Sequence, residues 1–264
     1  MRKSRAAHLC RLECVQHLIA AGVELSGERD FTGAYPAHVA LTHDHTPRSA
    51  LLKLVLENTS PAVLAEAAAV ADKVPPVALF ASASLRPPAF HTFVQPPGGA
   101  PQPPVTRATG GWIEHGTTLV VAHTPLVDAA LRLRASRVAV LLEHHEATVA
   151  AGTALPGVLC NTAAVADVTA AMVAAYVAGL DGVGAWCDTY PPTRPGRVAY
   201  RRVGRPFPKH ASQAIIRRLL NCAIPVDLEA ANTMIQAFES KLPADVLANR
   251  LGNKPGVLRM LRVR

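Results

Sequence analysis

The residues with the most obvious chemistry are cysteines and histidines near the start of the chain. Cys10, Cys14 and His17 are spaced as C-x3-C-x2-H, and His43 and His45 flank an aspartate. Zinc sites usually combine two such halves, and no second half lies nearby in the sequence. We therefore expect Cys14 and His17 to pack on a helix rather than to bind a metal, and we expect no cofactor.

Motifs for catalysis are missing from the sequence. It contains no G-x-S-x-G, no G-x-x-x-x-G-K-[ST] and no G-x-G-x-x-G that precedes a helix. The glycine-rich stretch 179–184 follows a helical pattern, so we expect a turn there. His144 and His145 are expected to end a helix, where positive charge suits the helix dipole. The sequence predicts a protein that is not an enzyme.

Composition favours closely packed helices in an intracellular protein. Half of the 264 residues are apolar but only 5% are aromatic, so small side chains dominate the apolar part. The five cysteines are scattered and odd in number, which favours a reducing compartment, cytoplasmic or nuclear.

Targeting and membrane segments are not expected. Arg11 and Glu13 interrupt the apolar run that a signal peptide would need. The range 147–166 contains no charged side chain and is long enough to span a membrane, but Gly152, Pro156 and their neighbours make it rich in turn residues. We expect no membrane association.

Positive charge is concentrated in the last third of the chain. The formal net charge is +8, and no acidic residue occurs in the range 189–226. Such a segment suits a phosphate or an acidic protein surface, whereas a solvated basic loop is the simpler interpretation. The predicted basic patch consists of Arg194, Arg197, Arg201, Arg202, Arg205 and Lys209.

The elements that would position these residues follow a recurring pattern. An alanine pair opens one short helical stretch, and a second apolar stretch follows it and ends at a small residue or a histidine. Recurrence of this kind over a few tens of residues is typical of solenoids. The pattern runs from Ala6-Ala7 to Gly22, from Ala129-Ala130 to His145, and from Ala163-Ala164 to Gly179.

Two stretches resemble the ankyrin repeat, whose signature T-P-L-H-x-A recurs once in each unit of helix pair and turn. The range 30–40 reads D-F-T-G-A-Y-P-A-H-V-A, and the range 124–130 reads T-P-L-V-D-A-A. Taken from the threonine position, copies begin near Met1, Tyr35, Thr124 and Val158, and the two spacings within these pairs agree with the period of the family. The resemblance implies a structural role for His38. It also implies that the first copy is a frayed cap or part of a longer array.

Other segments fit the repeat less well. Residues 75–81 are expected to form a first helix, and residues 87–104 an insertion loop, because the many prolines of that range prevent a packed helix. A polyproline ligand is the alternative for that loop. Residues 50–57 and 214–223 are expected to be second helices, and 230–238 and 243–251 a terminal helix pair. The predicted segments are 1–73 and 124–188, with ankyrin-like repeats, 74–123, a degenerate repeat with the insertion, and 189–264, a basic segment with a helical cap.

The predicted fold is therefore an all-α, ankyrin-like helical repeat solenoid with irregular proline-rich insertions. The resemblance implies non-catalytic binding of a protein partner, as a scaffold or adaptor, through the concave face. The alternatives are binding of nucleic acid or another polyanion by ranges 194–218 and 250–264, or recruitment of a ubiquitin-ligase component by the C-terminal helices around 242–247. The predicted partner-binding residues are Phe31, Thr32, Val39, Thr42, His43, Asp128, Leu131, Arg132, Thr162, Val165, Trp186 and Asp188.

Overall fold

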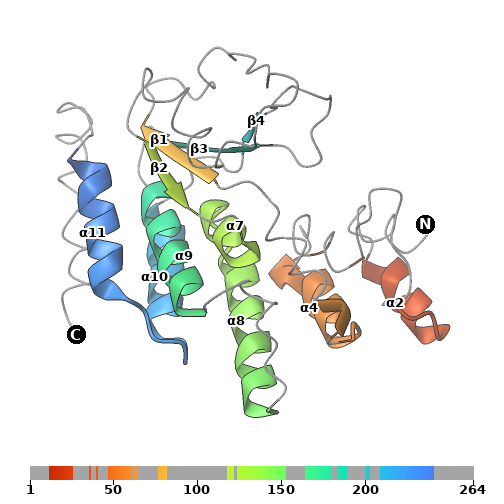
Figure 1. Cartoon of the computed structure of the whole chain (residues 1–264). Helices are drawn as coiled ribbons and strands as arrows, with labels where there is room; N and C mark the ends of the chain where they lie inside the picture. Colours follow the sequence, from red (N-terminus) through yellow and green to blue (C-terminus); the bar gives the residue numbers. More distant parts are fainter. Residues whose placement is uncertain are drawn as a thin grey trace, which may run out of the picture. The chain divides into compact units, whose positions relative to one another are not determined.

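A computed structural model of the chain gives two compact units, each built from separate stretches of sequence. Figure 1 labels the helices and strands of the described residues. Unit 1 contains Met1–Lys73, Thr124–Leu126 and Ala135–Ala164, and unit 2 contains Val74–His123, Val127–Arg134 and Val165–Arg264. The structure describes residues 12–25, 36, 40, 47–60, 62–64, 77–81, 118–121, 124–152, 164–179, 183–188, 200–202 and 209–240.

The helices of unit 1 pack through short apolar stripes. They are α2 (Leu12–Ala20), the 3₁₀-helix η1 (Pro47–Ser49), α4 (Ala50–Glu57) and α8 (Ala135–Ala150). α4 lies against α2 and α8, and α8 also lies against η1. The buried stripe of α4 is Leu51, Leu52, Val55 and Leu56, a spacing that places one face of a helix in the core.

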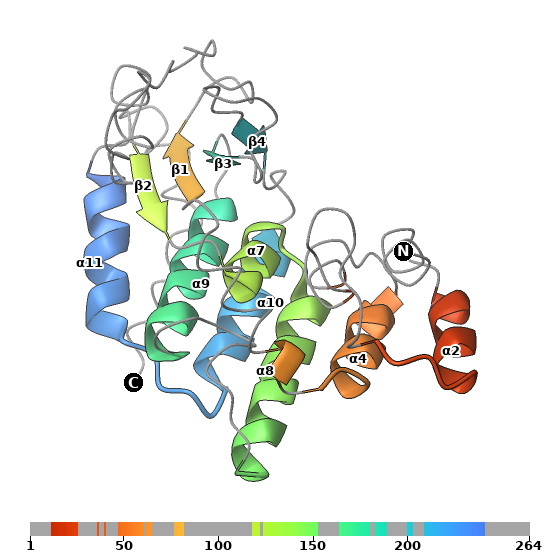
Figure 2. The same cartoon turned by 45° about the vertical axis from the view of Figure 1, so that its right-hand side comes forward.

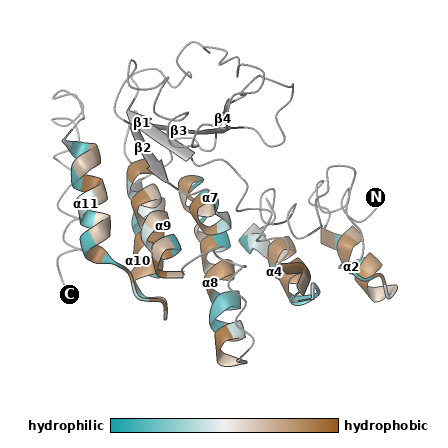
Figure 3. Ribbon diagram, in the orientation of Figure 1, coloured by the Kyte–Doolittle hydropathy of each residue, from teal (hydrophilic) through white to brown (hydrophobic). Residues whose placement is uncertain are grey.

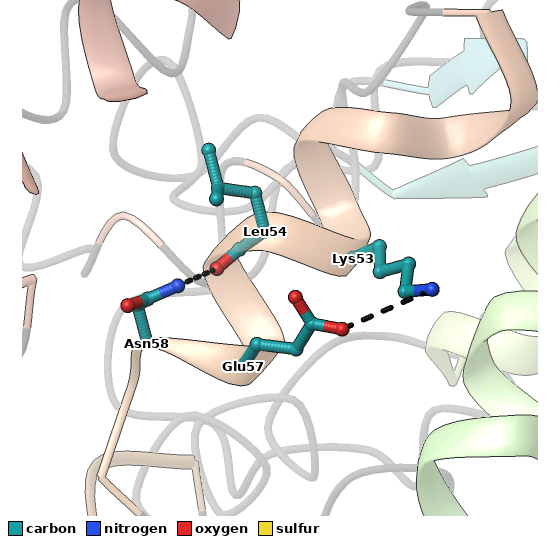
Figure 4. A network of polar contacts seen from close by, with 4 residues as sticks. All are labelled: Lys53, Leu54, Glu57 and Asn58. Atoms are coloured by element: carbon teal, nitrogen blue, oxygen red, sulfur yellow. Dashed lines mark hydrogen bonds and ion pairs between the residues drawn. The ribbon is translucent and has the colours of Figure 1, made fainter. Parts of the chain in front are cut away.

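Both ends of α4 are fixed by hydroxyl and amide groups. The Oγ atoms of Ser49, at its start, and Ser136, in α8, are hydrogen-bonded at 3.1 Å. At its end, the Asn58 amide donates to the Leu54 carbonyl at 2.8 Å (Figure 4). The Thr59 hydroxyl donates to the Val55 carbonyl at 2.6 Å. These bonds satisfy carbonyls that the last turn of a helix leaves without partners. The predicted helix 50–57 is therefore confirmed, with its end at Asn58.

α7 (Pro125–Leu131) ends in a turn formed by a leucine where glycine is usual. Leu133 has φ of 51°, its N–H donates to the Ala130 carbonyl, and the N–H of Arg134 donates to the Ala129 carbonyl. This pair of bonds is the Schellman motif, whose left-handed residue is most often glycine. The same motif follows α2: Gly22, with φ of 76°, donates its N–H to the Ile19 carbonyl, and the N–H of Val23 donates to the Leu18 carbonyl.

Unit 2 contains α9 (Ala164–Ala178, of which Ala164 belongs to unit 1), α10 (Lys209–Leu220) and α11 (Leu228–Glu239). α9 is buried on all sides along most of the stretch from Asp167 to Val177, as expected for an alanine- and valine-rich helix inside a domain. The Ser212 hydroxyl of α10 donates to the Ala175 carbonyl of α9 at 2.7 Å. A Cβ atom at Gly179 would lie 2.6 Å from the Ser212 side chain, so α10 crosses the end of α9 closely.

A four-stranded antiparallel sheet completes unit 2 (Figure 2). Its strand order is β2-β1-β3-β4, and β2 lies against α11. The strands are β1 (Val77–Ala81), β2 (Thr118–Val121), β3 (Val183–Asp188) and β4 (Tyr200–Arg202).

The helical character predicted from the sequence is confirmed for the described core. The buried apolar residues of that core lie on the helices and on the turns that follow them. In the segment 35–41, the described residues Pro36 and Ala40 are helical and buried. α11 confirms the helix predicted at 230–238, and α10 overlaps the one predicted at 214–223 but begins at Lys209 and ends at Leu220. The predicted helix 243–251 lies outside the described residues.

Three local predictions are wrong. Residues 77–81 form β1 instead of a helix, because a short apolar run with valine and phenylalanine suits either state and the pairing with β2 and β3 decides it. The glycine-rich turn predicted at 179–184 runs into β3 at Val183. α9 is one continuous helix where the repeat pattern predicts two, since nothing between Ala164 and Ala178 breaks a helix.

Candidate partner-binding surface

Three predicted partner-binding residues lie on or directly after α7. Asp128 and Leu131 are buried, so their side chains belong to the interior. Arg132 is partly accessible, and its Nε atom donates to Oδ2 of Asp128 at 2.8 Å. Because the Asp128 side chain is only 4% exposed, the guanidinium neutralises a charge that water reaches poorly. Arg132 therefore has a structural role, and its replacement would disturb α7 as well as any binding surface.

The start of α9 carries an accessible apolar side chain. Val165 is 37% exposed, whereas Val168, one turn later, is buried. The helix thus enters the core within its first turn and leaves Val165 outside. Val165 is therefore a predicted binding residue whose apolar side chain a partner could reach.

The sheet brings together residues that the sequence analysis placed in two different sites. Trp186 of β3 is the register partner of Arg202 in β4, and Asp188 is the partner of Tyr200. Arg201 lies opposite Cys187. Trp186 and Asp188 are therefore in a paired strand, an element that the predicted helical repeat solenoid does not contain. The predicted partner-binding and basic residues meet at β3 and β4.

α10 extends the basic segment. It begins at Lys209, ends after Arg217 and Arg218, and contains no acidic residue. Its buried face is formed by Ser212, Ile215, Ile216 and Leu219, which leaves Arg217 exposed. The remaining predicted residues and segments lie outside the described part: Phe31, Thr32, Val39, Thr42, His43, Thr162, Arg194, Arg197, Arg205 and the ranges 242–247 and 250–264.

The histidines and cysteines differ from expectation. Cys14 and His17 are exposed on α2 and do not pack in the core, because the face that is buried contains Val15. His144 and His145 do not end a helix, since α8 continues to Ala150. Within the described ranges, no three His, Cys, Asp or Glu side chains are placed to hold a metal ion.

The sequence analysis did not predict one exposed apolar residue. Val149 is 51% exposed near the end of α8, where the buried stripe of that helix has already ended. The interruption of the apolar spacing after Leu142 is the signal that could have located it.

Comparisons with known proteins add no identification. The chain matches no family model, and it has no significant similarity to a curated protein or to a solved structure. In the described part of the chain, no helix combines the length and the apolar character that crossing a membrane requires.

Proposed function

We propose that this chain is a non-catalytic protein-binding module, and that the β3–β4 ladder is the centre of its binding surface. The supporting observation is the register that pairs Trp186 with Arg202 and Asp188 with Tyr200. Tryptophan, tyrosine and arginine are the residue types that contribute most often to binding hot spots. Four residues of these types, Trp186, Tyr200, Arg201 and Arg202, thus occur on two neighbouring strands of one sheet.

The position of β4 in the sheet adds to this proposal. In the described sheet, β4 is the last strand in the order β2-β1-β3-β4. The outer side of an edge strand presents backbone N–H and C=O groups that an extended segment of a partner can pair with. A partner peptide added beside β4 would lie next to Tyr200 and Arg202, one strand away from Trp186.

The ankyrin-like part of the proposal applies best to residues 124–150. There the T-P-L signature coincides with the start of α7, and a tight turn at Leu133 leads to α8. This segment would act as a scaffold.

The experiment compares proteins captured by the intact chain and by the variant Trp186→Ala, with Val149→Ala as the control. Both variants remove an apolar side chain, but Val149 is exposed on α8, away in sequence from the ladder. The proposal expects a protein that Trp186→Ala loses and Val149→Ala retains, with unchanged circular dichroism for both. Identical capture by all three chains would contradict it.

A second candidate function, binding of a polyanion, is favoured by the two adjacent arginines of β4. Arg201 and Arg202 lie inside the range 189–226, which contains no acidic residue, and α10 lies in the same range. Released counterions would make such binding strongly dependent on salt. On a heparin column, Arg201→Gln with Arg202→Gln should then elute at lower salt than the parent chain. Trp186→Ala should elute unchanged, which separates this candidate from the first.

A further inference from the structure

The buried stripe of α8 changes its chemistry halfway along the helix. Val138, Leu141 and Leu142 in the first half are fully buried. One turn later the same stripe contains His144 and His145, which follow Leu141 and Leu142 by three positions and are half-buried. In Figure 3 this change is visible as a hydrophilic band across α8.

The two imidazoles each keep a nitrogen atom away from water. Nε2 of His144 and Nδ1 of His145 are inaccessible to solvent and are hydrogen-bonded to nothing in the described part of the chain. A buried imidazole without partners is tolerated best when it is neutral, because a proton would add a charge that neither water nor an acceptor stabilises.

Among the described residues, the charged groups around this position come from three elements. α8 packs against η1 and α4. α4 carries Lys53 and Glu57, which are exposed and 3.9 Å apart (Figure 4), and η1 carries the exposed Arg48. α8 itself contributes Glu143 and Glu146 beside the histidines.

For both histidines, the effect of burial on the pKa is larger than the effect of these charges. Burial lowers the pKa of His144 below its ordinary value of 6.5, Glu57 opposes the change, and His145 adds to it. Burial also lowers the pKa of His145, against the effect of Glu146. The packed state thus binds fewer protons than an open state in which both imidazoles are hydrated.

We infer that the second half of α8, residues 143–150, is an acid-sensitive segment that leaves its packed position when His144 and His145 become protonated. The packed state of residues 143–150 is fully stable above about pH 6.5 and becomes less stable as the pH falls below that value. The reason is that only the open state then takes up the protons readily. The first half of α8 has an apolar stripe and stays packed. The inference does not depend on the proposed function.

The test is hydrogen exchange of the intact chain at pH 7.5 and pH 5.0, corrected for the intrinsic exchange rates. Protection of residues 143–150 should fall at pH 5.0, by at most about 30-fold for each histidine that stays neutral in the packed state. Protection of residues 137–142 should change much less. The loss should disappear in the double variant His144→Gln with His145→Gln.

Two further variants make the result specific. Glu57→Gln removes the carboxylate that favours protonated His144, so residues 143–150 should lose more of their exchange protection at pH 5.0 than in the parent chain. His17→Gln removes an exposed histidine of α2 and should change nothing. Equal loss along the whole of α8, or a pH dependence that survives the double variant, would overturn the inference. A smaller loss of exchange protection in Glu57→Gln than in the parent chain would also overturn it.

Discussion

The hydroxyl of Tyr176 donates a hydrogen bond of 2.5 Å to Oε1 of Glu239, which lies 63 residues later in the chain. Tyr176 is in the last turn of α9 and Glu239 is the last residue of α11, so the bond joins the ends of two helices of unit 2. The acceptor is a carboxylate, and bonds of this kind are stronger than those between neutral groups.

Tyr176→Phe should lower the free energy of unfolding by about 1.5–3 kcal/mol, because it removes a charge-assisted bond and keeps the buried ring. Chemical denaturation measures this change. Glu239→Gln keeps an acceptor oxygen and serves as the control, with a smaller loss. If both substitutions cost less than about 0.5 kcal/mol, the bond does not hold α9 and α11 together.

Gly179→Ala should destabilise unit 2 by about 1–3 kcal/mol, because the added methyl group would overlap Ser212. The measurement is again chemical denaturation, combined in a double-mutant cycle with Ser212→Gly. Removal of the Ser212 side chain makes room for the methyl group, so the two changes should cost less together than the sum of their separate effects. Simple additivity would show that α10 does not approach Gly179 as closely as the structure indicates.

Asp227→Ala should cost about 1 kcal/mol of stability, because Asp227 is the N-cap of α11. Its Oδ1 accepts from the N–H of Ala230 at 2.9 Å. Asp227→Asn and Asp227→Ser retain an oxygen in this position and should recover most of the loss in thermal unfolding. If Asp227→Asn lowered the stability as much as Asp227→Ala, that result would contradict the capping role.

A neighbouring bond ties the same cap to α9. The N–H of Asp227 donates to Oγ1 of Thr169 at 3.1 Å, and the Thr169 hydroxyl donates to the Val165 carbonyl at 2.7 Å. Thr169→Val keeps the shape of the side chain but removes this acceptor, so it should destabilise the start of α11 even though Asp227 is intact.

The sequence predicts an element of this chain correctly where residues close to it in the sequence decide its structure. α4 was predicted with its bounds because apolar spacing and Asn58 act within a few residues. β1 was missed because its state is decided by β3, which lies far along the chain, and a short apolar run does not distinguish strand from helix.

Candidate site residues show the same limit. Helical spacing alone did not reveal that Asp128 is buried beside Arg132 or that Val149 is exposed, because burial depends on where neighbouring elements end. The extent of α8 decided the environment of His144. Once the helix is seen to continue to Ala150, a position expected at a helix end becomes part of a buried stripe.

At Leu133, substitution by glycine should destabilise the protein less than substitution by alanine. Its backbone is left-handed, with φ of 51°, and its side chain is buried. Leu133→Ala loses the burial of the leucine side chain, about 1.5–3 kcal/mol, and keeps the backbone strain. Leu133→Gly loses the same burial but relieves about 1–2 kcal/mol of strain. Thermal or chemical unfolding should therefore rank the parent chain above Leu133→Gly, and Leu133→Gly above Leu133→Ala. Gly22→Ala tests the other turn of this type, where no side chain is lost and only strain is added, and it should also be destabilising. If Leu133→Ala were more stable than Leu133→Gly, the turn after α7 would not be left-handed in solution.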